Sequence, residues 1–168
     1  MLASVALAVS ALVIPAQPVA AMDASMALPG DPAIMKLISA EQALIDLTNA
    51  DRVSNGLDPV QFDPDTLAIA RERAGSQLGA QPLSHYDANG KLIFAYMLSD
   101  ANVPYAIAGE NLARSTAEDT NLPQRVEQAL MQSPPHRKNI LERVFKRVAI
   151  GAAIAETGQI AFAEVYRD

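Results

Sequence analysis

The sequence lacks cysteine altogether. This absence excludes disulfide bonds, thiolate zinc sites, cysteine nucleophiles and lipid attachment to an N-terminal cysteine. Positive charge is also scarce, since 13 Lys and Arg stand against 19 Asp and Glu and the formal net charge is -6. Such an acidic balance argues against general nucleic-acid binding. Half of the 168 residues are hydrophobic, so the chain can bury one substantial core as a single domain.

Long hydrophobic runs are missing as well. The apolar run from Leu2 to Ile14 is too short to span a bilayer, which argues against a permanent membrane anchor. It lies in a segment without charged side chains and precedes the small residues Val19-Ala20-Ala21. This pattern predicts a secretory signal peptide over residues 1–21, whose removal leaves no stable membrane span. No Lys or Arg follows Met1, so either the signal is weak or the true start lies upstream.

Turn-forming residues separate this segment from the folded part of the chain. Pro29-Gly30 lies in residues 22–35, which have the composition of a linker, and the domain is predicted to occupy residues 36–168. Apolar residues at helical spacing predict a first helix from Lys36 to about Ser54, which Asn55-Gly56 ends.

A second helix is predicted after Asp63, which can cap it, with Pro64 in its first turn. The buried stripe of this helix is predicted to consist of Leu67, Ala70, Ala74 and Leu78. The charged residues between them, Arg71, Glu72 and Arg73, are predicted to face water.

The later elements change from helix to strand. Helices are predicted over residues 92–98 and 121–132, with an extended segment between them from Pro104. Two apolar runs, 148–155 and 160–166, flank a four-residue turn that contains Gly158, which is typical of a hairpin. Helices followed by a hairpin predict an α+β domain whose antiparallel sheet is covered by the helices.

Three separate stretches carry the side chains that can do chemistry. They are Ser84-His85, Gly109-Glu110-Asn111 and the segment 133–141, which contains His136 between prolines and basic residues. Two neutral imidazoles and a carboxylate can hold zinc or another divalent cation, though weakly without a fourth ligand. The alternatives are a loop histidine bonded to a main-chain carbonyl for His85, a helix-end residue for His136, and a buried carboxylate paired with imidazole or N–H groups for Glu110.

These stretches, in this order and followed by Val148–Ala153, resemble the bacterial branch of the CAP superfamily. That family groups cysteine-rich secretory proteins, antigen 5 and plant pathogenesis-related proteins, and its domain is also called SCP-like. The resemblance covers roughly residues 36–168. It implies a three-layer α-β-α sandwich with a central antiparallel sheet, in a protein that is secreted or lies in the cell envelope.

The resemblance also implies a cleft in which a histidine from each of two loops meets acidic residues. His85 matches the first family histidine, Glu110 the glutamate of the Gly-Glu-Asn motif, and His136 the second histidine. A fourth member, glutamate in many eukaryotic relatives, has no match here, and Ser133 is nearest to its position. Three further departures are Leu130 where tryptophan is usual, Pro135 where glycine is usual, and Glu164 where glutamine is common.

Two classes of function follow. The first is a secreted binding module whose cleft takes a divalent metal ion, a small or lipid-like ligand, or a component of the cell envelope. The second is a metal-dependent hydrolase of peptide or cell-envelope substrates, in which Glu110 acts as the base and His85 and His136 hold the metal. The missing fourth carboxylate favours the binding module. No Gly-x-Ser-x-Gly elbow, His-Glu-x-x-His motif, P-loop or dinucleotide fingerprint is present, which argues against a recognisable enzyme class.

One local cluster of positive charge stands out in this acidic chain. It consists of Arg137, Lys138, Arg143, Lys146 and Arg147. We expect this basic cluster to form a solvated face beside the site. The alternative is a docking surface for an anionic cell-wall polymer or lipid headgroups.

Overall fold

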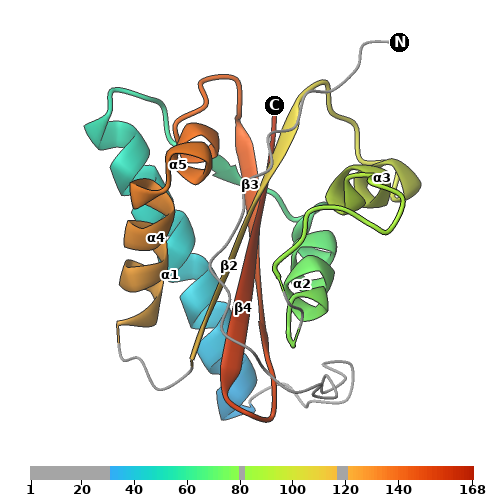
Figure 1. Ribbon diagram of the computed structural model, residues 1–168. Coiled ribbons are helices and arrows are strands. Elements are labelled where there is room, and N and C mark those ends of the chain that lie inside the picture. Colours follow the sequence, from blue (N-terminus) through green and yellow to red (C-terminus); the bar gives the residue numbers. More distant parts are fainter. Residues whose placement is uncertain (1–30, 80–81, 117–120) are drawn as a thin grey trace.

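The computed structural model describes residues 31–79, 82–116 and 121–168. They form three layers, with a central sheet between two layers of helices (Figure 1). The signal peptide predicted over residues 1–21 and most of the predicted linker lie outside the described residues. The helices in these ranges are α1 (Pro32–Ser54), α2 (Leu67–Ser76), α3 (Ile93–Asp100), α4 (Leu122–Gln132) and α5 (Pro134–Ile140). The four strands are β1 (Gln61–Phe62), β2 (Ala108–Thr116), β3 (Arg147–Ile154) and β4 (Gln159–Arg167).

The sheet has the strand order β1-β3-β4-β2. Both β2 and β3 run antiparallel to β4, and the predicted hairpin is the pair β3–β4, with Gly158 at a φ of 78° in its turn. The two-residue strand β1 pairs parallel with β3 at the opposite edge. The sheet is therefore mixed rather than wholly antiparallel as predicted, because β1 is joined to β3 by a long connection containing helices and not by a hairpin.

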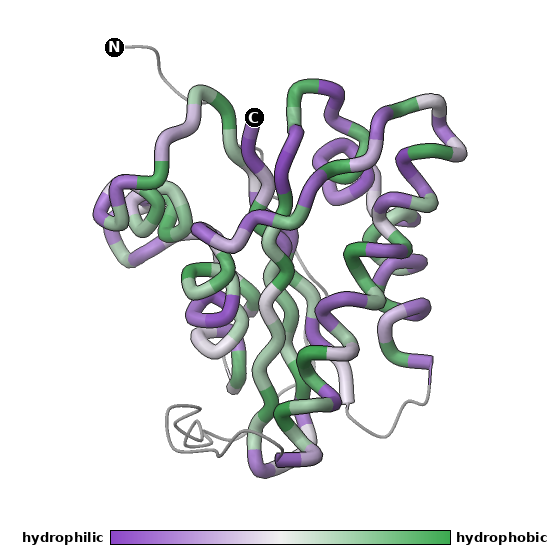
Figure 2. Tube along the Cα trace, turned by 180° about the vertical axis from the view of Figure 1, so that it is seen from behind, coloured by the Kyte–Doolittle hydropathy of each residue, from purple (hydrophilic) through white to green (hydrophobic). Residues whose placement is uncertain are grey.

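Side chains of the strands alternate between two helical layers. Helices α1, α4 and α5 cover one face, and α2 and α3 cover the other (Figure 1). In β3, Val148 and Ile150 belong to the hydrophobic cluster that contains α1 and α4 residues, whereas Ala149 belongs to the cluster of α2 and α3. This period of two is what a strand imposes, and both faces are apolar because both are covered. Figure 2 shows the central strands mostly green between helices of alternating colour. The predicted α+β class and α-β-α layering are confirmed.

Helix α1 starts four residues before the predicted position. The Asp31 carboxylate accepts a hydrogen bond from the Ala33 amide at 2.8 Å, and Pro32 occupies the first turn. Because this first turn is largely exposed, it carries no apolar stripe that could mark it in the sequence. The helix ends at the predicted signal, since Gly56 adopts a φ of 73°. Each of these helices, in the ranges that the structure describes, is too short or too polar to cross a membrane.

Helix α2 lies unusually close to the sheet. A Cβ atom on Gly151 of β3 would be 2.2 Å from the main chain of Ala70 and Arg71, so only glycine fits there. Asp63 does not cap this helix as predicted, because it is fully buried and accepts bonds from Thr66 and from Arg167. The intervening turn postpones the helix start to Leu67.

Candidate functional site

The structure brings two of the three predicted site residues into direct contact. His85 lies in the loop between α2 and α3, and Glu110 lies in β2. The imidazole Nδ1 of His85 is 2.7 Å from Oε2 of Glu110, and both residues are buried. For His85, the alternative of a bond to a main-chain carbonyl is therefore replaced by a bond to a carboxylate 25 positions away in the sequence.

Arg73 of α2 completes this contact. Its guanidinium donates from Nε to Glu110 Oε1 at 2.7 Å and from one terminal nitrogen to Oε2 at 3.2 Å. The same nitrogen also donates to the carbonyl of Ser84, the residue before His85, at 2.7 Å. We call this set of residues, Arg73, His85 and Glu110, the Arg–Glu–His network.

The prediction that Arg73 faces water is wrong. Only 1% of the residue is exposed, because position 73 lies three residues after Ala70 and next to Ala74, on the face that packs against the sheet. A buried arginine is stable there because the Glu110 carboxylate compensates its charge. The position of Arg73 on the buried face of α2 could have indicated that it is buried. Its partner Glu110 in β2, however, is not visible from the sequence of the helix.

The Arg–Glu–His network fixes the proton on His85. The carboxylate of Glu110 only accepts hydrogen bonds, so the bond assigns the imidazole hydrogen to Nδ1. Nε2 of the neutral ring then carries the free lone pair. Arg73 already balances the charge of Glu110, so the network does not require His85 to be an imidazolium.

His136 lies in α5 and is half-buried. The predicted site-bearing turn is thus a short helix, since Pro134 and Pro135 occupy its first turn, where proline needs no N–H partner. Burial, and second to it repulsion from His85 when that ring is protonated, lower the pKa of His136. Both effects favour a neutral imidazole at His136 around neutral pH. Among the described residues, no three His, Asp or Glu side chains lie together in an arrangement that could hold a metal ion.

Comparison with known proteins identifies the family. The pattern of the cysteine-rich secretory protein family, CAP, matches residues 45–166. The chain belongs to the CAP family. A Bacillus subtilis (strain 168) relative, the uncharacterized protein YkwD, is 32% identical over 120 residues, which are 71% of this chain and 44% of that protein. The present chain therefore spans less than half of that relative.

Solved structures share the fold of this CAP domain. An extracellular protein containing an SCP domain from Bacillus anthracis str. Ames has a TM-score of 0.63 at 23% identity, over 84% of this chain and 45% of that one. An outer surface protein from Borrelia burgdorferi has a TM-score of 0.64 at 15% identity, over 77% of this chain and 92% of that one. The predicted membership of the CAP superfamily is confirmed, and relatives of this fold are described as extracellular or outer-surface proteins.

Two asparagines fasten α5 to the sheet beside the network. Asn111 Nδ2 donates to the carbonyl of His136 at 3.3 Å, and Asn139 Nδ2 donates to Asn111 Oδ1 at 2.9 Å and to the carbonyl of Glu110 at 3.1 Å. Asn111 is fully buried in β2. These bonds fix the helix that carries His136 relative to the strand that carries Glu110.

The serine next to His85 is occupied by main-chain bonds. The hydroxyl of Ser84 donates to the carbonyl of Tyr86 at 2.9 Å and accepts from the Tyr86 amide at 3.1 Å. This arrangement shapes the loop and leaves Ser84 without a hydrogen bond to a histidine in the part of the chain that the structure describes. A serine nucleophile at this position is not supported, in agreement with the sequence.

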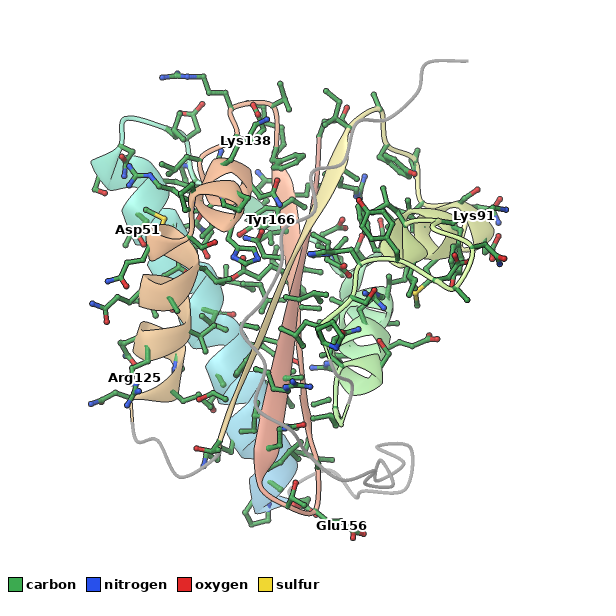
Figure 3. All side chains as sticks on the ribbon, viewed as in Figure 1. Asp51, Lys91, Arg125, Lys138, Glu156 and Tyr166 are labelled. Atoms are coloured by element: carbon green, nitrogen blue, oxygen red, sulfur yellow. The ribbon has the colours of Figure 1, made fainter. Side chains whose placement is uncertain are left out.

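A groove of about 490 Å³ lies at the junction of α4 and α5. Apolar, cationic and polar side chains line it together: Met131, Gln132, Pro134, Arg137, Lys138, Leu141 and Glu142. Figure 3 shows Lys138 at the end of the molecule opposite Glu156, which lies in the β3–β4 turn. Part of the basic cluster therefore borders a groove on the same helix as His136, which the sequence could not show.

Proposed function

We propose that this CAP domain is an exported binding module whose site takes a divalent metal ion through the imidazoles of His85 and His136. The observation that carries the proposal is the Arg–Glu–His network, in which Nδ1 of His85 bonds to Glu110, so that Nε2 is the nitrogen available to a metal ion when the ring is neutral. A carboxylate that orients a ligating histidine through its other nitrogen is a recurrent device at protein metal sites.

The donor set fits a metal ion in part. Two neutral imidazoles suit zinc and similar cations, which act as Lewis acids when bound. Both oxygens of Glu110 are engaged by Arg73 and His85, so Glu110 serves by holding His85 rather than by contacting the ion. With two nitrogen ligands and no thiolate, binding should be weak.

Calorimetric titration with zinc tests the site. The chain has only two histidines, both in the candidate site, so His85→Ala and His136→Ala should each abolish most of the binding. Protons compete for imidazole nitrogen, whose ordinary pKa is about 6.5, so binding should be modest at pH 7.5 and markedly weaker at pH 5.5. Glu110→Gln should have a smaller effect than either histidine variant.

The matched control for Glu110→Gln is Glu142→Gln, which removes a carboxylate from the α4–α5 groove. It should leave the zinc affinity unchanged. If wild type and the double histidine variant bind zinc alike, the two histidines do not form one metal site.

The α4–α5 groove supports a second ligand for the same module, an anionic lipid-like molecule of the cell envelope. Arg137 and Lys138 can pair with an anionic group, while Met131, Pro134 and Leu141 offer apolar surface for the rest of the molecule. Flotation with vesicles of phosphatidylglycerol, compared with phosphatidylcholine, measures this directly. Lys138→Glu should lose the preference for anionic vesicles, whereas Lys91→Glu, on the opposite side of the sheet, should keep it (Figure 3).

A metal-dependent hydrolase is the second candidate, and the His85–Glu110 contact is the observation that favours it. A histidine oriented by a carboxylate can take a proton from water at its other nitrogen, so His85 would act as the base in place of Glu110, whose two oxygens are engaged, and His136 would be the histidine left to contact the metal. Turnover of peptide, ester and peptidoglycan substrates should then depend on added zinc and be lost in His136→Ala. Zinc binding without turnover of any of these substrates would contradict the hydrolase and support the binding module only.

Export rests on the signal peptide predicted over residues 1–21 and on the extracellular and outer-surface descriptions of structural relatives. Mass spectrometry of the protein from the culture medium should find a chain that begins near Met22. Retention of the intact N-terminus in the cytoplasm would contradict export.

A further inference from the structure

Two buried carboxyl groups lie within electrostatic reach of each other on the side of the sheet away from Arg73. Glu127 of α4 and Glu164 of β4 are 3% and 1% exposed. Glu127 Oε2 accepts a bond from the Thr48 hydroxyl at 3.2 Å. Glu164 Oε2 accepts from Asn111 Nδ2 at 2.9 Å and from the Tyr166 hydroxyl at 2.8 Å.

The other oxygen of each carboxyl is an orphan. Within the described residues, Oε1 of Glu127 and Oε1 of Glu164 are buried and have no hydrogen-bond partner. Leaving a buried polar atom unsatisfied is costly, and leaving two ionised carboxylates there is more costly still. A carboxylate only accepts, so neither group can satisfy the other while both are ionised.

The surroundings add negative rather than positive charge. Asp51 on α1 adds a negative charge near Glu127, and the Tyr166 hydroxyl on β4, whose raised pKa keeps it neutral, adds no charge. Figure 3 shows Tyr166 between the sheet and α5, and Asp51 on α1 beside α4. The nearby guanidinium of Arg52 is committed elsewhere, since it donates to the main-chain carbonyls of Asp58, Ile140, Glu142 and Phe145. Among the described residues, no Lys or Arg side chain donates to either glutamate.

We infer that Glu127 and Glu164 form a buried proton-binding site, in which Glu127 is a neutral carboxylic acid at neutral pH and its proton is held among the neighbouring carboxyl oxygens. One proton changes an orphan acceptor into a donor. It also removes one of two negative charges from a region without a compensating cation. The site is separate from His85 and His136.

The titration tendencies of the two groups agree with this assignment. Burial, then the charges of Glu164 and Asp51, raise the pKa of Glu127 to about 9. Burial also raises the pKa of Glu164, to about 6, and the bonds from Asn111 and Tyr166 oppose that rise. Glu164 therefore gives up its proton first, and Glu127 retains its own.

The proton-binding site is connected to the helix that carries His136. Asn111 donates to Glu164 and to the His136 carbonyl from the same side-chain nitrogen. The glutamate pair therefore lies behind α5 and supports it through Asn111. Its protonation should influence how firmly α4 and α5 pack on the sheet.

Carbon-13 NMR of the full chain, labelled at glutamate Cδ, measures the proton directly. The Glu127 signal, assigned by its loss in Glu127→Gln, should stay at the shift of a neutral acid at pH 7 and titrate well above 7. Asp51→Asn should lower its midpoint, because it removes a neighbouring negative charge. A Glu127 signal that titrates near the ordinary value of about 4.3 would overturn the inference.

Thermal unfolding provides a second readout with a signed expectation. A carboxyl group whose pKa is raised by folding stabilises the protein fully below its unfolded pKa, and this contribution is lost as pH rises toward the folded value of about 9. Between pH 5 and pH 9 the melting temperature of the wild type should fall relative to that of Glu127→Gln, by on the order of 5 °C. The matched control Glu72→Gln removes an exposed carboxylate and should retain the wild-type pH dependence.

Two further results decide the assignment. If Glu127→Gln does not fold, the NMR titration of wild type and the pH dependence of Glu164→Gln carry the test, and an unchanged pH dependence in Glu164→Gln overturns the shared site. If Ca²⁺, Mg²⁺ or K⁺ at pH 8 stabilises wild type but not Glu127→Gln and ionises Glu127, the pair binds a cation instead of a proton.

Discussion

The two faces of the sheet each bury carboxyl groups, and they neutralise them differently. On the α2 face, Glu110 is held by the guanidinium of Arg73 and by His85. On the α4 face, Glu127 and Glu164 are bonded to hydroxyl and amide groups, and one oxygen of each is unsatisfied among the described residues. On the α2 face a guanidinium cation compensates the carboxylate charge. On the α4 face, in our inference, a bound proton neutralises one of the two carboxylates.

This difference determines what each face tolerates. A guanidinium remains charged at every accessible pH, so the Glu110 carboxylate keeps its compensating cation. A proton can leave, so the glutamate pair is sensitive to alkali. Removing one partner of the buried group should therefore lower the unfolding free energy strongly on the α2 face and only slightly on the α4 face.

The largest effect is expected from Arg73→Met. The substitution leaves the Glu110 carboxylate buried without its cation, which should cost on the order of 3–5 kcal/mol of unfolding free energy. Urea denaturation at pH 7 measures the loss. The double variant Arg73→Met with Glu110→Gln should recover part of it, because no uncompensated charge remains.

A matched control lies on the same helix. Arg71 also donates two bonds to one glutamate, Glu41, but its side chain is 44% exposed. The carboxylate left behind, Glu41, is itself buried but keeps the hydrogen bond from the Ala152 amide, so Arg71→Met should cost less than Arg73→Met. Equal losses in the two variants would mean that burial does not govern the difference.

An intermediate effect is expected from Glu127→Met. If Glu127 is neutral, an apolar side chain of similar length replaces a protonated acid, and stability at pH 7 should change by less than about 1.5 kcal/mol. The principal cost is the Thr48 hydroxyl, which loses its acceptor. A loss as large as that of Arg73→Met would show that the glutamate is ionised and needed in that form.

The smallest effect concerns the titration of His136, which lies beside both networks. Its lowered pKa means that its contribution to stability is present above about 6.5 and is lost as pH falls through the lower folded value. Proton NMR should place its midpoint below 6.5. In His85→Asn the only remaining histidine should titrate higher, but still below 6.5, because burial is the larger cause. No change would show that the two imidazoles do not share one site.

The sequence predicted those features that depend on local pattern. The hairpin with Gly158 and the end of α1 at Asn55-Gly56 both follow from spacing and turn chemistry. The family motifs led to His85, Glu110 and His136, and the structure joins the first two directly. Whether the three hold a metal ion stays a prediction.

The missed features depend on partners that are distant in the sequence. Arg73 resembles a solvated helix residue until β2 brings Glu110 to it, 37 positions later. Glu127 likewise resembles an ordinary polar residue of α4 until the packing of α4 on α1 and β4 buries it beside Thr48 and Glu164. The amphipathic pattern indicates which face of a helix is buried. It does not show which polar side chains on that face find a hydrogen-bond or charge partner in the adjacent layer.

Glu110 and Asn111 are consecutive residues of β2, and they serve opposite faces of the sheet. A single-residue insertion in β2 before Glu110 would turn its carboxylate to the other face, toward Glu164, and leave Arg73 without its partner. A two-residue insertion would return each side chain to its original face of the sheet but would move both groups roughly 7 Å along the strand. Length changes should therefore be confined to the loops that flank β2, and homologous chains that differ in length can be aligned by keeping the Glu-Asn dipeptide as a fixed, ungapped unit.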